Sequence, residues 1–144
     1  PPKCGKTTLL RDIIRILSNS GLRISVCDER SELAGMHQGI RTYDLGPRTD
    51  VLDGCAKAEG MIMMIRSMSP DVLVTDEIGK AEDIEAIQMA VSAGVRVLTT
   101  VHGKDYEDLI KSPAGTLVNK GLFSRIIVLT NLPTTGTIKE VINV

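Results

Sequence analysis

The sequence predicts an α/β fold in which a mostly parallel sheet is flanked by helices. Short apolar runs alternate along the chain with longer segments whose apolar residues recur at helical spacing. Strands that alternate with helices favour right-handed crossovers, which place helices on both faces of a parallel sheet. At 144 residues, the chain is long enough for one core, and we expect a single domain over residues 1–144.

The expected helices begin with residues 7–18, in which Leu10, Ile14 and Leu17 lie on one face. The other expected helices cover residues 54–68, 81–93, 105–111 and 114–120. The expected strands cover residues 22–27, 72–74, 95–101, 124–130 and 137–144, and the last two form an antiparallel hairpin. Residues 31–53 have several glycines and little periodicity, so we expect a long loop with one helical turn.

Composition restricts the classes of function. Apolar residues make up 42% of the chain and aromatic residues 2%, so the core must be aliphatic. The net charge of -1 gives no global indication of direct nucleic-acid binding, which would need local evidence. The cysteines lack the paired spacing of a zinc site, which favours reduced thiols in a cytoplasmic compartment.

The first eight residues, Pro-Pro-Lys-Cys-Gly-Lys-Thr-Thr, are typical of a phosphate-binding loop. That motif ends in Gly-Lys-Ser/Thr because only glycine lets successive backbone N–H groups face the phosphates. Gly5-Lys6-Thr7 opens the first helix, whose N-terminus favours an anion. We expect Lys6 to neutralise the β- and γ-phosphates of ATP and Thr7 to ligate Mg²⁺. The expected nucleotide-binding residues are Pro2, Lys3, Cys4, Gly5, Lys6, Thr7 and Thr8.

The motif's first glycine, and the strand that normally precedes it, would lie before Pro1. We therefore expect the ATPase domain to be N-terminally truncated here. A parallel sheet that lacks a central strand leaves backbone groups unpaired. Residues 1–144 alone are expected to bind ATP poorly.

Two adjacent carboxylates follow the apolar run Val72–Val74. Strands of a parallel sheet deliver their following residues to the edge where ligands bind. Asp76 is expected to hold Mg²⁺, and Glu77 to polarise the water that attacks the γ-phosphate. A solvated turn is the alternative interpretation of this pair.

Polar residues end two further expected strands. His102 follows residues 95–101, where it would donate a hydrogen bond to the γ-phosphate or serve only as a structural strand-end residue. Asp28 and Glu29 end the strand at 22–27, and we include Glu29 among the catalytic candidates. The alternative for that pair is a solvated sheet edge. Candidates for an arginine finger from a neighbouring subunit are among Arg30, Arg41, Arg48, Arg66 and Arg125. The sequence does not choose among them, and the alternative for most is a surface or ion-pair residue.

Four segments together resemble the stage III sporulation protein AA family of endospore-forming bacteria. They are residues 1–8, 28–32, 46–53 and 69–77, and the resemblance extends over nearly the whole chain. That family is similar to the ATPases of bacterial secretion and type IV pilus systems, whose acidic box, second carboxylate motif and His box resemble Asp28-Glu29, Asp76-Glu77 and residues 100–103. Secretion ATPases often have Gly-Glu where this chain has Asp76-Glu77.

The resemblance implies a RecA-like P-loop NTPase core in which the strand before His102 lies beside the phosphate-loop strand. It implies a homo-oligomer, a hexameric ring, at the cytoplasmic side of the mother-cell membrane. ATP hydrolysis there would support a channel toward the forespore, with membrane proteins of that channel as partners.

Three alternatives stay open beside a ring-forming ATPase. A nucleotide-binding assembly switch would bind ATP with negligible turnover. A nucleic-acid-dependent motor would share the RecA-like core, although low aromatic content provides no stacking track. A nucleotide kinase would use the loop at residues 35–48 to cover a second substrate.

Overall fold

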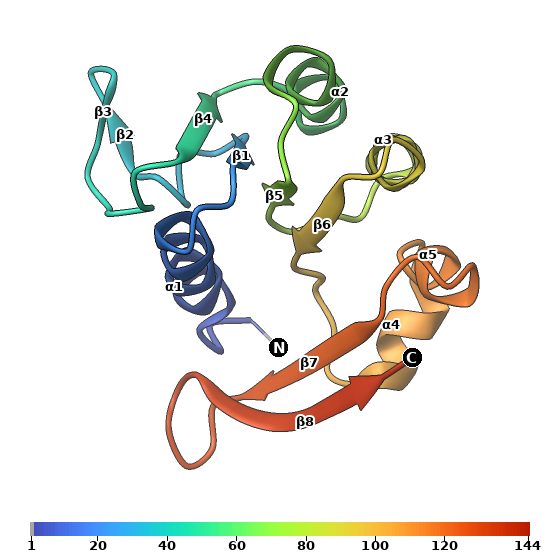
Figure 1. Ribbon diagram of the computed structural model, residues 1–144. Helices are drawn as coiled ribbons and strands as arrows, with labels where there is room; N and C mark the ends of the chain where they lie inside the picture. The colour runs from blue at the N-terminus through green and yellow to red at the C-terminus, as the bar shows by residue number, and fades with distance from the viewer. Residues whose placement is uncertain (1) are drawn as a thin grey trace.

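A computed structural model describes residues 2–144 (Figure 1). Its helices are α1 (Lys6–Asn19), α2 (Lys57–Met68), α3 (Ala81–Ser92), α4 (Tyr106–Lys111) and α5 (Gly115–Asn119). Its strands are β1 (Ile24–Asp28), β2 (Met36–His37), β3 (Ile40–Arg41), β4 (Thr49–Asp53), β5 (Val72–Thr75), β6 (Arg96–Thr99), β7 (Arg125–Thr130) and β8 (Thr137–Asn143). No helix within the described residues is both long enough and apolar enough to cross a membrane.

The central feature is a four-stranded parallel sheet in the order β4-β1-β5-β6. Its register places Cys27, Thr75 and Thr99 in one row near the carboxyl ends of their strands. Because the strands are parallel, the residues that follow this row emerge at the same edge of the sheet. The predicted α/β class, with a mostly parallel sheet flanked by helices, is confirmed.

Side chains alternate between the two faces of the sheet, and each face has its own core. Val26 and Val74 point toward α1 and pack with its buried Leu10 and Ile14. Leu73, one residue from Val74, belongs to the other core, which α2, α3 and α5 cover. Figure 1 shows α1 on one side of the sheet and α2 and α3 on the other. The period of two along each strand therefore produces a three-layer arrangement.

The prediction of a long loop with one helical turn at residues 31–53 was wrong. This segment contains the small antiparallel pair β2–β3 and the edge strand β4, and no helix. β4 pairs in parallel with β1 through its backbone, while only Thr49 among its side chains is buried. Val51 and Leu52 are partly buried and pack against the two cores, so two adjacent apolar residues are the only hydrophobic signal that this strand carries.

The antiparallel hairpin β7–β8 was correctly predicted, and its turn reaches back to the first residues of the chain. The Gly136 backbone N–H donates to the Cys4 carbonyl oxygen at 3.1 Å. Between β6, at one edge of the sheet, and β7 lies a cavity of about 200 Å³. Its apolar lining includes Leu9 of α1, Leu98 of β6 and Ile127 of β7.

Candidate nucleotide site

The residues of the predicted phosphate loop form a tight turn that leads into α1. Gly5 caps the helix with a left-handed backbone, φ 86°, which glycine adopts without strain. A Cβ at this position would lie 3.1 Å from the Cα of Gly136, so the close hairpin turn also favours glycine. No acidic residue occupies the first turn of α1, which leaves the partial positive charge of the helix N-terminus available to an anion.

The other residues of the loop differ in their exposure. Pro2, Lys3 and Thr8 are exposed, whereas Lys6 and Thr7 are half-buried. Cys4 is 1% exposed and its Sγ lies 3.9 Å from the Lys6 Nζ. The cysteine therefore faces the interior and supports the loop.

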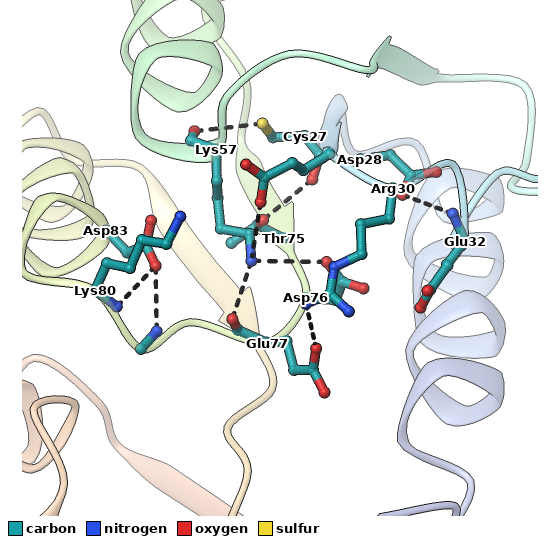
Figure 2. A network of polar contacts seen from close by, with 12 residues as sticks. Cys27, Asp28, Arg30, Glu32, Lys57, Thr75, Asp76, Glu77, Lys80 and Asp83 are labelled. Carbon is teal, nitrogen blue, oxygen red and sulfur yellow. Dashed lines mark hydrogen bonds and ion pairs between the residues drawn. The ribbon is translucent and has the colours of Figure 1, made fainter.

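Glu77, the second residue after β5, is held by contacts from three other segments. It has a left-handed backbone, φ 46°, which is uncommon for a residue other than glycine. Its N–H donates to the Thr100 Oγ1 at 2.8 Å. Its carbonyl oxygen accepts from the Lys57 Nζ at 3.0 Å (Figure 2). Its carboxylate accepts from Arg30 at 2.6 Å. These contacts hold the Glu77 backbone in this conformation.

The two carboxylates at the end of β1 have different environments. Asp28 is fully buried, and its carboxylate accepts the backbone N–H groups of Glu32 and Ala34 at 3.0 and 2.9 Å. It therefore shapes the turn after β1. Glu29 is partly exposed, and its Oε2 lies 3.9 Å from the Lys57 Nζ.

Asp76 lies beside Glu77 and is 6% exposed. Burial raises the pKa of its carboxyl group, because desolvation disfavours the charged form, and nearby Lys57 acts in the opposite direction. The Lys57 Nζ lies 4.0 Å from Asp76 Oδ1. Lys57 therefore links the ends of β1 and β5.

His102 lies three residues beyond the end of β6, because that strand ends at Thr99 rather than at the predicted residue 101. The imidazole is exposed, and it lines the cavity between β6 and β7 together with Lys6. The structure thus brings Lys6 and His102 to one cavity, and joins Glu29, Asp76 and Glu77 through Lys57 at the edge of the sheet.

Comparison with known proteins gives the family. The family model of sporulation stage III, protein AA, matches residues 1–144. The chain belongs to this family. Stage III sporulation protein AA of Bacillus subtilis (strain 168) is 45% identical over 98% of this chain and 48% of that protein. The uncharacterized protein ycf45 of Porphyra purpurea is 32% identical over 78% of this chain and 20% of that protein.

The chain therefore spans about half the length of its Bacillus relative and a smaller share of the Porphyra protein. Among solved structures, the Legionella pneumophila ATPase DotB matches with a TM-score of 0.54 and 21% identity, over 76% of this chain and 30% of that one. That likeness supports the P-loop NTPase fold for this member of the sporulation stage III protein AA family. The predicted family resemblance and fold are confirmed.

Sequence reasoning missed Lys57 at the candidate site of this family member, and it included Thr100 in the segment that resembles the His box without giving it a role. Lys57 shares the buried face of α2 with Met61 and Met64, four and seven residues further on. The sequence signal that could have identified Lys57 is its helical spacing from Met61 and Met64, which places this lysine on the apolar face of the helix. Arg30, considered as an arginine finger for a neighbouring subunit, pairs with Glu77 of its own chain.

The donor set fits a magnesium ion that is bound jointly with phosphates. Within residues 2–144, no group of three or more His, Cys, Asp or Glu side chains is arranged to hold a metal on its own. Mg²⁺ typically takes one or two carboxylates from the protein and its other ligands from phosphates and water. The Asp76 carboxylate and the Thr7 hydroxyl are of the required kind.

Proposed function

We propose that the chain is the ATP-hydrolysing domain of a Mg²⁺-dependent, ring-forming ATPase of the secretion type. The arrangement around Glu77 carries this proposal. A carboxylate that follows a buried strand is held in a strained backbone conformation by Thr100 and Lys57, beside a buried aspartate. Such rigid positioning serves a group that must orient a water molecule.

In the proposed mechanism, the loop at residues 2–8 and the N-terminus of α1 bind the phosphates of ATP. Lys6 would neutralise the charge of the β- and γ-phosphates, while Thr7 and Asp76 would hold Mg²⁺. The ion supplies charge stabilisation when it is bound. Glu77 accepts a hydrogen bond from the attacking water, and His102 donates one to the γ-phosphate. Glu29, at the end of β1, is a further candidate catalytic residue.

Glu77→Gln tests the assignment in the full-length protein. We expect phosphate release to fall by about 10²–10⁴-fold, the usual contribution of a general base. Binding of a fluorescent ATP analogue should persist, because the phosphate loop is intact. Glu85→Gln, at an exposed position on α3, is the matched control and should retain the wild-type rate. Equal rates for Glu77→Gln and wild type would refute the role of Glu77.

The proposal includes a hexameric ring that sits peripherally at the inner face of the mother-cell membrane. Family membership and the DotB-like fold support it. Hydrolysis there would support a mother cell to forespore channel, with membrane proteins as partners and no direct contact with nucleic acid. Mass photometry with and without ATP tests whether the ring forms. Stimulation of ATPase activity by single-stranded DNA would contradict the absence of direct contact with nucleic acid.

A specific contact favours the assembly switch as a second candidate. The 2.6 Å pair between Arg30 and Glu77 engages the proposed catalytic carboxylate. If this pair persists with ATP bound, the protein would bind nucleotide without turnover. Tight binding of ATP with no phosphate release in any oligomeric state would favour the switch over the ATPase.

A further inference from the structure

Lys57 is a buried cation at the centre of the acidic edge of the sheet. Its side chain is only 6% exposed, although it is the first residue of α2. Lysine is rarely buried unless it is paired, because desolvation of its charge is costly. Figure 2 shows its amine reaching toward Asp76 and the backbone of Glu77.

The contacts of the ammonium group divide into one hydrogen bond and two longer ion pairs. The hydrogen bond goes to the Glu77 carbonyl oxygen at 3.0 Å. The pairs with Glu29 and Asp76 are 3.9 and 4.0 Å long, too long for good hydrogen bonds. The ammonium therefore acts on both carboxylates mainly through its charge.

The charges around Asp76 are unbalanced without Lys57. Asp28 and Glu32 act on Asp76 as further negative charges, and Arg30, which acts on it as a second positive charge, bonds to Glu77. An acidic cluster with a buried carboxylate attracts divalent cations. The ammonium beside Asp76 opposes a second cation there.

We propose that Lys57 is an internal counter-cation that makes divalent-cation binding at Asp76 depend on bound nucleotide. This inference rests on the proposed Mg²⁺-ATP site. Without nucleotide, the ammonium balances the carboxylates and repels a divalent ion. The phosphates of the nucleotide add the negative charge and the oxygen ligands that overcome this repulsion. Lys57 also positions Glu77 through its carbonyl, so one residue links the metal side of the site to the catalytic side.

The test measures Mn²⁺ binding to the full-length protein by electron paramagnetic resonance. Wild-type protein should bind Mn²⁺ weakly without nucleotide and more tightly with ADP. In nucleotide-free protein, Lys57→Met should bind Mn²⁺ at least about tenfold more tightly than wild type, a difference of about 1.4 kcal/mol. Lys57→Gln removes the charge but keeps an N–H donor for Glu77, and should show the same gain.

Two controls separate the local charge from other effects. Lys57→Arg keeps the charge and should keep the weak binding of wild type. Lys111→Met removes a lysine from an exposed position on α4 and should also behave as wild type. Thermal unfolding identifies any variant that does not fold. If Lys57→Met does not fold, the Mn²⁺ affinity of Lys57→Gln tests the proposal instead.

Two results would overturn the proposal. One is equal Mn²⁺ affinity of wild type and a folded charge-free variant, and the other is tight Mn²⁺ binding by nucleotide-free wild type. The second measurement needs no variant. Because none of the nucleotide-free titrations uses ATP, they decide the role of Lys57 even if the protein proves to have no ATPase activity. If hydrolysis occurs, Lys57→Met should lower kcat with little change in the KM for ATP.

Discussion

At the scale of single residues, two adjacent threonines have opposite environments at the end of β6. The Thr100 Oγ1 accepts the Glu77 N–H, whereas the buried Thr99 Oγ1 has no hydrogen-bond partner within residues 2–144. A hydrogen bond contributes about 0.5–1.5 kcal/mol, while an unsatisfied buried hydroxyl costs free energy. Identical substitutions should therefore have different effects at these positions.

We expect Thr100→Val to lower the free energy of unfolding of residues 1–144 by about 0.5–1.5 kcal/mol. Thr99→Val should leave it unchanged or raise it, because a methyl group replaces an unpaired hydroxyl. Urea unfolding of both variants is the measurement. Equal losses of stability would show that the bond to Glu77 contributes nothing.

A second prediction at this scale concerns thiol reactivity. Burial raises the pKa of Cys27 to about 12, with the nearby Cys55 thiol and carboxylates acting in the same direction. The thiolate is the reactive form, so Cys27 should resist a thiol reagent at neutral pH while the chain is folded. The half-buried Cys55 is the internal comparison and should react first. Mass spectrometry of the labelled peptides distinguishes them, and faster labelling of Cys27 would contradict its burial.

At the scale of secondary-structure elements, Gly60 lets α2 approach β1 closely. A Cβ at Gly60 would lie 2.7 Å from the Cys27 Sγ. Ala is better than Gly inside a helix by about 0.8–1.0 kcal/mol, but overpacking typically costs about 1–3 kcal/mol. The clash should therefore outweigh the gain in helix propensity.

We expect Gly60→Ala to destabilise the fold by about 1 kcal/mol, the difference between these two effects. Adding Cys27→Ala removes the sulfur and should recover much of the loss, so the double variant is more stable than the sum of the single changes predicts. Thermal unfolding of the four proteins completes the cycle. Strict additivity would show that the two residues do not clash.

The ion pair between Arg23 and Asp71 joins the segments that precede β1 and β5. Bonds from the Arg23 side chain and backbone lower the pKa of the Asp71 carboxyl. A carboxyl group whose pKa is lower in the folded state stabilises the fold above its unfolded pKa, about 3.9, and loses this contribution as pH falls. The melting temperatures of wild type and Asp71→Asn should therefore differ at neutral pH and converge below that value. A constant difference across this range would contradict the assignment.

At the scale of the whole molecule, β6 and β7 line one apolar cavity without pairing to each other. A protein in which an apolar, strand-forming segment is fused before Pro1 is expected to place that segment in this space and to pair it with the edge of β6. It should melt at least about 2–4 °C higher than residues 1–144, the shift expected for each 1 kcal/mol at this size. It should also bind ATP more tightly.

The control for that experiment is an extension of the same length composed of glycine and serine. It adds chain without apolar side chains or β-propensity, so it should change neither property. Equal effects of the two extensions, or no effect of either, would refute a strand in the cavity.

Much of the site was predictable because it follows buried strands. The apolar runs at β1 and β5 were recognisable, so Asp28-Glu29 and Asp76-Glu77 were expected at one edge, and the parallel register places them there. β4 was not predictable, because most of its side chains are partly or fully exposed and carry no clear period, and its pairing with β1 is not encoded locally.

The sequence by itself determined the layers of this protein, because the periods of apolar residues decide which faces are buried. It also determined the types of residue at the strand ends and the phosphate-loop motif. Only the tertiary structure decided which charges meet. Lys57 is close to Glu77 in space although they are 20 residues apart in the chain. Such contacts depend on the order of strands in the sheet, which local periodicity does not encode.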